Sequence, residues 1–127
     1  MNILSLFLLL SLIVACPDGY IKLSEAYIDS NGNGKFDIEE KYSDLNYNNE
    51  WDSELCLFEA DYDVIDFFYK NSYNRSESLL SFGIQKWDDG RLASWICIEC
   101  DIRTNSLEML GALTSIRKLD LAKNSIS

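Results

Sequence analysis

The chain has 127 residues, a net charge of −10 and no histidine. This length accommodates one compact domain or two very small ones, and the acidic balance excludes the electrostatic attraction on which nucleic-acid binding depends. The lack of histidine removes the commonest general base and every Ser–His or Cys–His catalytic arrangement. Paired carboxylates of the glycosidase type need a rigid cleft, and the acids here cluster in loops, so a hydrolase is the least expected class. We therefore expect a non-enzymatic protein.

Residues 3–14 form an almost unbroken apolar run near the N-terminus. The run is too short to cross a bilayer and is typical of the core of a signal peptide; a buried core helix is the alternative. We expect residues 1–15 to be a signal peptide, and the mature protein to be secreted or displayed at the cell surface.

Export would place the four cysteines in an oxidising compartment, where thiols pair. Cys16 and Cys56 flank the acidic loops and are the candidates for a disulfide. Residues 13–16 also resemble a bacterial lipobox, in which the cysteine carries lipid and becomes the mature N-terminus, so that Cys56 would lose its partner. A lipid on Cys16 is the sole membrane attachment that the sequence indicates. Cys97 and Cys100 are expected to be packed thiols or a local pair.

The acidity of the chain belongs to one segment. Residues 16–66 contain fourteen acidic residues and three basic ones, whereas residues 67–127 contain seven and eight. An evenly solvated surface would not explain why carboxylates and asparagines alternate within this segment. Bound divalent cations would relieve its self-repulsion.

Residues 29–40 match the twelve-residue loop by which an EF-hand binds calcium. Oxygen-bearing side chains occupy loop positions 1, 3, 5, 9 and 12, and Gly34 occupies the sharp turn at position 6. The expected Ca²⁺ ligands are Asp29, Asn31, Asn33, the backbone carbonyl of Lys35, Asp37 and Glu40. Three carboxylates and two neutral amides predict a weak site, with a dissociation constant of about 10⁻⁴ to 10⁻³ M. An Asn/Gly-rich turn without metal is the alternative.

The same pattern recurs fifteen residues later, in residues 44–55. The expected ligands of this second loop are Asp44, Asn46, Asn48, the backbone carbonyl of Glu50, Asp52 and Glu54. Asn49 replaces the turn glycine, which asparagine tolerates because it visits the left-handed region. Leu55 replaces the closing glutamate, so Glu54 would have to substitute from an offset position. We expect the second site to be weaker, and a metal-free turn is again the alternative.

The fifteen-residue period leaves about three residues between the loops, too few for the helices that flank each loop of an EF-hand pair. Residues 23–28 could form one short entering turn. The arrangement resembles the helix-poor tandem calcium loops of secreted bacterial surface proteins, in the style of thrombospondin type 3 repeats, over residues 29–58. Phe36 and Trp51, both at loop position 8, are expected to pack one loop on the next.

The C-terminal third carries a second period, of 24 residues. Residues 116–126 fit the leucine-rich-repeat pattern L-x-x-L-x-L-x-x-N-x-L, and residues 92–102 fit it again. The matched positions are Ile116, Leu119, Leu121, Asn124 and Ile126, and before them Leu92, Trp95, Cys97, Cys100 and Ile102. Leucines in residues 106–113 recur at three-residue steps and predict a helix or 3₁₀ turn between the two strands.

Residues 59–90 suit the cap that such a repeat array needs at its open end. Val64, Ile65, Phe67 and Phe68 form a helical apolar face, and residues 82–87 read as a strand. A hairpin turn at residues 88–90 leads into the first repeat strand, residues 91–98.

Residues 107–126 resemble bacterial and plant leucine-rich repeats, and residues 83–92 look like the N-terminal cap of secreted bacterial members of this class. A generic strand–helix–strand unit is the alternative. The resemblance implies an α/β fold that begins a leucine-rich-repeat solenoid with a helix-plus-hairpin cap, preceded by helix-poor calcium loops. The expected parts are a signal peptide (1–15), an acidic segment (16–58), a cap (59–90) and incomplete repeats (91–127). The pattern ends before a third repeat, so a fragment of a longer protein is a further alternative.

Leucine-rich repeats bind protein or glycan ligands through their concave face. The residues expected on that face are Ser94, Ile96, Ile98, Lys118, Asp120 and Ala122. The alternative is that Ile96 and Ile98 pack under the capping hairpin. We therefore expect a calcium-binding interaction protein, with a calcium-stabilised structural spacer as the second interpretation.

Overall fold

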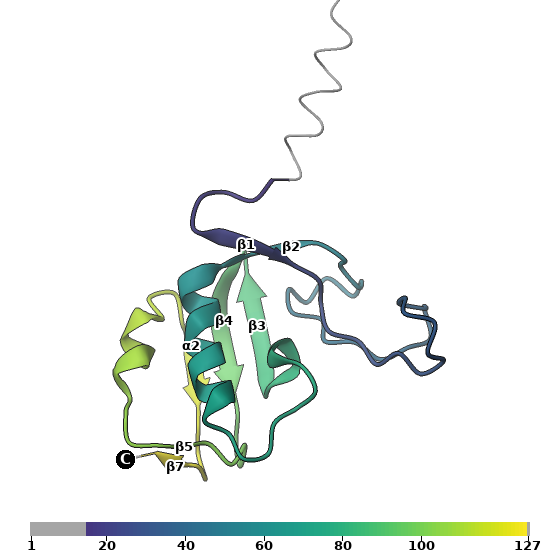
Figure 1. The fold of residues 1–127 in the computed structure, drawn as a ribbon. Helices are drawn as coiled ribbons and strands as arrows, with labels where there is room; N and C mark the ends of the chain where they lie inside the picture. The colour runs from purple at the N-terminus through teal and green to yellow at the C-terminus, as the bar shows by residue number, and fades with distance from the viewer. Residues whose placement is uncertain (1–14, 127) are drawn as a thin grey trace, which may run out of the picture.

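A computed structural model describes residues 15–126, which form a small mixed α/β fold (Figure 1). The elements in chain order are β1 (Tyr20–Leu23), β2 (Leu55–Phe58), α2 (Glu59–Lys70), η1 (Leu79–Ser81), β3 (Ile84–Asp88), β4 (Arg91–Ile96), β5 (Arg103–Thr104), η2 (Glu108–Ala112), β6 (Lys118–Asp120) and β7 (Ser125–Ile126). The predicted core of the signal peptide, residues 3–14, lies outside the described residues. Within residues 15–126, no helix has both the length and the apolar character needed to cross a bilayer.

The central sheet has three strands in the order β3-β4-β6. β3 and β4 form an antiparallel hairpin, and β4 runs parallel to β6 with Ser94 opposite Lys118 and Trp95 opposite Leu119. Each of these partners lies 24 residues from the other, which is the spacing of the predicted repeat. Two smaller sheets pair β1 with β2 and β5 with β7.

Helix α2 covers one face of the central sheet (Figure 1). Glu59 and Asp61 lie in its first turn, where negative charge interacts favourably with the helix dipole. Val64, Ile65 and Phe68 form the buried stripe of the helix, at the three- and four-residue spacing that places side chains on one face. The sheet therefore has one covered face and one face that carries Ser94, Ile96 and their neighbours.

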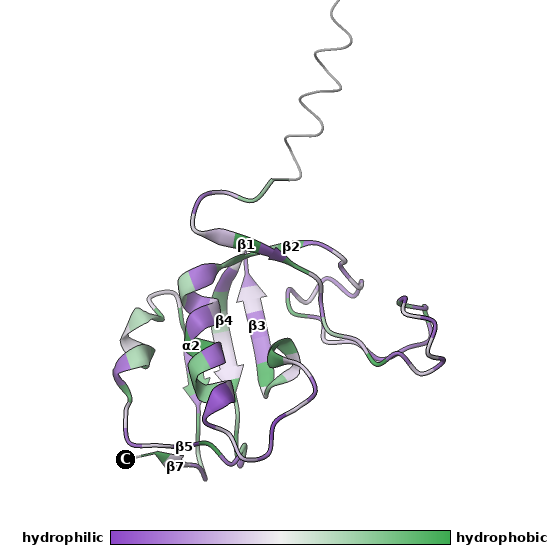
Figure 2. Ribbon diagram, viewed as in Figure 1, coloured by the Kyte–Doolittle hydropathy of each residue, from purple (hydrophilic) through white to green (hydrophobic). Residues whose placement is uncertain are grey.

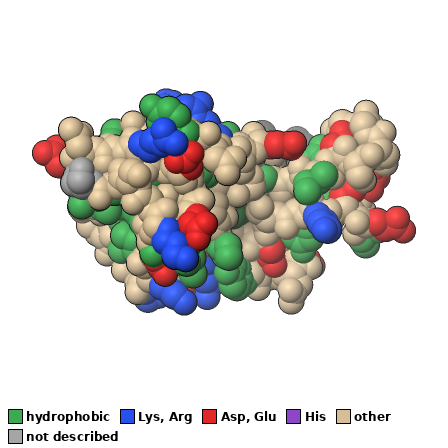
Figure 3. Space-filling view, turned by 90° about the horizontal axis from the view of Figure 1, so that it is seen from below, with side chains coloured by type: hydrophobic (Ala, Val, Ile, Leu, Met, Phe, Trp, Pro, Cys, Tyr) green, Lys and Arg blue, Asp and Glu red, His purple; other side chains and the backbone are tan. Residues whose placement is uncertain are grey.

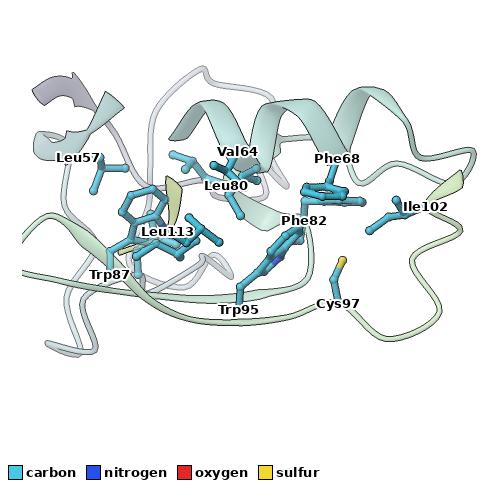
Figure 4. Close-up of a cluster of buried hydrophobic side chains, with 13 residues drawn as sticks. Leu57, Val64, Phe68, Leu80, Phe82, Trp87, Trp95, Cys97, Ile102 and Leu113 are labelled. Atoms are coloured by element: carbon cyan, nitrogen blue, oxygen red, sulfur yellow. The ribbon is translucent and has the colours of Figure 1, made fainter. Parts of the chain in front are cut away.

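The hydrophobic core lies between α2 and the central sheet (Figure 4). Its largest side chains are Trp87 and Trp95, which are fully buried. Both indole N–H groups are satisfied, because Trp87 donates to Gln85 Oε1 at 2.9 Å and Trp95 donates to the carbonyl of Phe82 at 3.0 Å. These bonds allow two polar ring atoms to enter the core without an unpaired donor.

A buried ion pair joins α2 to the start of β4. The Asp61 carboxylate is fully buried and accepts hydrogen bonds from the backbone N–H of Leu92 at 2.9 Å and from Arg91 Nε at 2.8 Å. The hydrogen bond to Asp61 raises the pKa of the Arg91 guanidinium above its usual value. The guanidinium also lies 4.2 Å from the centre of the Phe58 ring, so it fixes β2, α2 and β4 together.

Residues 92–102 and residues 116–126, which we call the two units, are joined by one asparagine and by several backbone hydrogen bonds. Asn124 Nδ2 donates to the carbonyls of Cys97 at 2.7 Å and Leu121 at 2.9 Å, and Asn124 Oδ1 accepts from the backbone N–H of Ile102 at 2.9 Å. Cys97 and Cys100 are joined by a disulfide. One amide side chain thus satisfies backbone groups of both units at the point where the chain leaves the strand.

Several boundaries differ from the sequence-based expectations. The strand predicted at residues 82–87 is β3, which begins at Ile84 and ends at Asp88. β4 ends at Ile96, so Ile98 lies in the following turn and not in the strand, and Ala122 likewise lies in a turn after β6. Residues 98 and 99 form a turn, in which Glu99 has a left-handed backbone (φ 56°). Residues 23–28 form no helical turn; β1 ends at Leu23 and the chain continues without helix.

Candidate metal centre

The acidic residues between β1 and β2 form a lobe that projects from the rest of the fold (Figures 1 and 2). We call residues 24–54 the loop module; it contains nine acidic and two basic residues. Acidic side chains are visible over this projecting part in the view from below (Figure 3). The antiparallel pair of β1 and β2 forms its stem, and a disulfide between Cys16 and Cys56 closes the stem, with the Cα atoms 5.4 Å apart. In this structure the Cys16 sulfur is bonded to Cys56, as one of the two sequence-based alternatives for Cys16 predicted.

The backbone of the first loop folds around its own ligand side chains. The N–H of Gly34, at loop position 6, donates to Asp29 Oδ2 at 2.8 Å, and the N–H of Lys35 donates to Asn33 Oδ1 at 2.9 Å. Each bond occupies one lone pair of an oxygen that has others available. The loop thus orients the oxygens at positions 1 and 5 and leaves them able to bind a cation.

The remaining ligand side chains of the first loop converge as well. Asn31 Nδ2 and Asn33 Nδ2 donate to Asp37 Oδ2 at 2.8 and 2.9 Å. The Glu40 carboxylate is buried, and it accepts from the N–H of Ser30 through Oε2 at 2.8 Å and from the N–H of Asp37 through Oε1 at 2.7 Å. Glu40 therefore clamps loop positions 2 and 9, and the predicted ligand positions lie within one hydrogen-bonded network.

The second loop repeats this network. The N–H of Asn49 donates to Asp44 Oδ2 at 2.8 Å, and the N–H of Glu50 donates to Asn48 Oδ1 at 2.9 Å. Asn46 Nδ2 and Asn48 Nδ2 donate to Asp52 Oδ2 at 3.1 and 3.0 Å. Four hydrogen bonds of the first loop thus recur at the same loop positions fifteen residues later.

The backbone conformations of the two loops also agree. Loop positions 4 and 6 have positive φ in both: 69° and 77° at Gly32 and Gly34, and 59° and 64° at Tyr47 and Asn49. Only glycine adopts this region without cost. The second loop therefore keeps the conformation of the first despite less suitable residues.

Glu25, and not Glu54, closes the second loop. Glu25 is 1 % exposed, and its carboxylate accepts from the N–H of Leu45 through Oε2 and from the N–H of Asp52 through Oε1, both at 2.7 Å. Leu45 and Asp52 occupy loop positions 2 and 9, the two positions that Glu40 clamps in the first loop. Glu54, which the sequence analysis placed in this role, is exposed and lies 3.8 Å from Lys22 Nζ.

A signal for Glu25 was present in the sequence. The fifteen-residue repeat extends four residues before each loop, because Glu25, Tyr27 and Asp29 recur as Glu40, Tyr42 and Asp44. Glu25 is thus the counterpart of Glu40 in the repeat. The EF-hand pattern places the closing acid inside its own loop, whereas Glu25 lies outside the loop that it clamps.

Aromatic side chains hold the two loops together. Phe36 and Trp51 stack with ring centres 4.7 Å apart and an interplanar angle of 18°, as their shared position in the loops predicted. The ring of Tyr27 contacts both of them edge-on, and the backbones of Tyr27 and Tyr42 form a β-bridge. The loops are therefore packed as a pair, with the repeated residues facing each other.

The electrostatics of the module reflect its crowded carboxylates. Burial raises the pKa of Glu25; its two backbone hydrogen bonds oppose this rise, and the charges of Asp52 and Asp44 add to it. Burial also raises the pKa of Tyr27 and Tyr42, and neighbouring carboxylates increase the effect. A cation bound among these groups would remove much of this repulsion.

The donor chemistry of the loops fits a hard cation such as Ca²⁺, which takes six to eight oxygen ligands. Asn46 Oδ1, at position 3 of the second loop, is buried and has no hydrogen-bond partner, whereas its counterpart Asn31 Oδ1 accepts from the N–H of Asn33 at 3.2 Å. Lys35 and Glu50, expected to contribute carbonyls, are exposed. Among residues 15–126, no three acidic or cysteine side chains form a compact metal cluster by themselves; each candidate set mixes carboxylates with amides.

The residues of the predicted ligand-binding face lie on or next to the uncovered face of the central sheet. Ser94 pairs with Lys118 and Ile96 pairs with Asp120, so these four are brought together. Ile98 and Ala122 are exposed in the turns that follow β4 and β6. Ile96 is half-buried and lies opposite Ile84 of β3, which is 61 % exposed.

Comparison with known proteins identifies no relative from which a role could be transferred. No family model matches the chain, and neither a curated protein nor a solved structure matches it.

Proposed function

We propose that this is a secreted or surface-displayed, non-enzymatic protein that binds Ca²⁺ through its two loops and a protein or glycan ligand through the uncovered face of its sheet. The observation that supports calcium binding best is the repetition of one hydrogen-bonded network in both loops. In each network carboxylate and amide groups occupy EF-hand ligand positions 1, 3, 5 and 9, and the backbone occupies only part of their capacity to accept bonds.

Calcium would stabilise the folded loop module and would take no part in a catalysed reaction. Nine carboxylates and two basic residues occupy a module of 31 residues, and its buried apolar side chains are few. Bound Ca²⁺ would neutralise charge and link residues along each loop. For a site of the expected strength, a hundredfold excess of calcium over the dissociation constant would stabilise the folded state by about 2.7 kcal/mol.

The proposal of a leucine-rich-repeat surface rests on register and on one side chain. The parallel strands β4 and β6 pair residues 24 positions apart, and Asn124 bonds backbone groups of both units, as an asparagine at that repeat position would. Ser94, Lys118 and Asp120 then lie on the face that such repeats use for ligands. Membrane contact is not needed for this role.

Calcium titration calorimetry on the exported protein, with its disulfides intact, tests the calcium proposal. We expect two binding events in the unchanged protein and the loss of one in Asp29→Ala and in Glu40→Ala. Glu39→Ala is the matched control, because Glu39 is an exposed acid of the same loop outside the ligand positions; it should keep both events. Equal melting temperatures in chelator and in 100-fold excess calcium, with no binding heat, would refute calcium binding.

A calcium-stabilised spacer is the second candidate. Binding of the labelled protein to arrays of glycans and surface proteins separates the two functions. Lys118→Glu reverses one exposed charge on the proposed face, whereas Lys70→Glu reverses an exposed charge on α2. Binding that is lost in the first variant and kept in the second supports recognition; binding that neither variant changes, or no binding, supports the spacer.

A further inference from the structure

The second loop differs from the first in where its closing carboxylate comes from. In the first loop Glu40 belongs to the same twelve residues as Asp29, so the whole ligand set is one continuous segment. In the second loop the clamp on positions 2 and 9 comes from Glu25, which lies 20 and 27 residues before its two partners. The second site is therefore assembled from two segments that are distant in the chain.

Resting on the proposed calcium function, we propose that Glu25 is the closing Ca²⁺ ligand of the second loop. We further propose that this site forms only while the Cys16–Cys56 disulfide and the β1–β2 pair hold the two segments together. The first site, which is continuous in sequence, does not depend on that disulfide. Loss of the Cys16–Cys56 disulfide should therefore weaken calcium binding at the second loop and leave binding at the first loop unchanged.

The position of Glu25 supports a role as ligand beyond that of a structural clamp. Each carboxylate oxygen accepts one hydrogen bond and retains a further lone pair. The same loop contains Asn46 Oδ1, a buried oxygen without a partner, whose amide nitrogen bonds to Asp52. The backbone N–H of Asp52 in turn donates to the Glu25 carboxylate. An oxygen-seeking cation would satisfy both the spare lone pairs and the unpartnered oxygen.

The stem explains how Glu25 is held in place. Leu23 at the end of β1 pairs with Leu55 at the start of β2, and the N–H of Glu25 continues this pairing by donating to the carbonyl of Asp52 at 3.0 Å. The indole N–H of Trp51 donates to the Glu25 carbonyl at 3.0 Å. Glu25 therefore meets the second loop because β1 lies beside β2, and the disulfide is the covalent bond that fixes this arrangement.

Two amide resonances report the sites separately in a calcium titration followed by NMR. The Gly34 N–H donates to Asp29 and the Asn49 N–H donates to Asp44, so each amide senses the first ligand of its own loop. In the unchanged full-length exported protein both amides should shift with calcium. In Glu25→Gln the Asn49 midpoint should rise at least tenfold while the Gly34 midpoint stays within threefold.

Glu54→Gln is the matched control, since Glu54 is the acid that an in-loop closure would use; it should leave both midpoints unchanged. The double variant Cys16→Ser/Cys56→Ser should raise the Asn49 midpoint at least tenfold and keep that of Gly34. The buried Trp95 indole resonance would reveal whether Glu25→Gln fails to fold. In that case the cysteine variant still tests the dependence on the disulfide, and Glu54→Gln still tests whether the closing acid lies inside the loop.

The outcomes are distinguishable from those that test calcium binding itself. If neither amide shifts in the unchanged protein, the proposed function fails and this inference fails with it. If both shift, but the Asn49 midpoint is unchanged in folded Glu25→Gln or moves in Glu54→Gln, Glu25 is not the closing ligand. If the disulfide variant keeps both midpoints, or loses both together, the dependence of the second site on the disulfide is overturned.

Discussion

Replacing Asp61 with alanine tests the ion pair that joins α2 to the central sheet. The substitution leaves the buried N–H of Leu92 without an acceptor, which costs about 1–3 kcal/mol. It also removes the partner of Arg91. Breaking a fully buried pair costs about 3–5 kcal/mol, but the Arg91 side chain is 24 % exposed and retains a bond to Thr114 Oγ1 at 2.9 Å. We therefore expect a loss of about 3 kcal/mol in the free energy of unfolding.

Urea unfolding followed by tryptophan fluorescence measures this loss, because Trp87 and Trp95 are fully buried in the folded state. Asp63→Ala is the control: Asp63 is an exposed acid two residues further along the same helix, and its replacement should change stability by less than about 0.5 kcal/mol. Both variants are measured at one fixed calcium concentration. If Asp61→Ala lies within 1 kcal/mol of Asp63→Ala, the argument that this carboxylate holds the helix on the sheet is wrong.

Three further substitutions test local parts of the structure. Asn49→Gly relieves a positive φ of 64° and should stabilise the protein by up to about 1 kcal/mol; a lower melting temperature would contradict this. Asn124→Ala removes two hydrogen bonds that join the units and one within the second unit, and should cost about 2–3 kcal/mol in urea unfolding; a cost below about 0.5 kcal/mol would refute the bridging role. Gly83→Ala would place a Cβ 2.6 Å from the Ile96 carbonyl, whereas Gly32→Ala meets nothing within 4 Å. The first should therefore lower the melting temperature more than the second; equal effects would contradict the close approach.

The sequence indicated the local elements well where a short pattern determines them. The apolar spacing of Val64, Ile65 and Phe68 predicted the helix, and the predicted turn forms at Asp89 and Gly90, both at positive φ, while Asp88 still belongs to β3. The side chains that form the hydrogen-bonded network of each loop could likewise be numbered from residue type alone, because each is defined by its distance from the first aspartate. The helix, the turn and the loop pattern are each determined by residues that are close together in the sequence.

The features that the sequence analysis missed depend on contacts between distant residues. Glu25 closes the second loop because the loops pack in pairs and β1 lies beside β2, and neither fact follows from the pattern within one loop. The end of β4 was misplaced for a related reason. The alternating apolar residues continue to Ile98, but the backbone enters the left-handed region at Glu99, and the Cys97–Cys100 disulfide spans this turn.

The loop expected to bind calcium more weakly is the one that is connected to the core. Leu45, at position 2 of the second loop, is 1 % exposed and belongs to the hydrophobic core. Its carbonyl accepts from the N–H of Trp87 at 2.6 Å, and its N–H donates to Glu25. The first loop, by contrast, reaches the rest of the protein mainly through the stacking of Phe36 on Trp51. An ion in the second loop would therefore hold the Leu45 backbone against the sheet and stabilise the whole fold, whereas an ion in the first would mainly stiffen the projecting lobe.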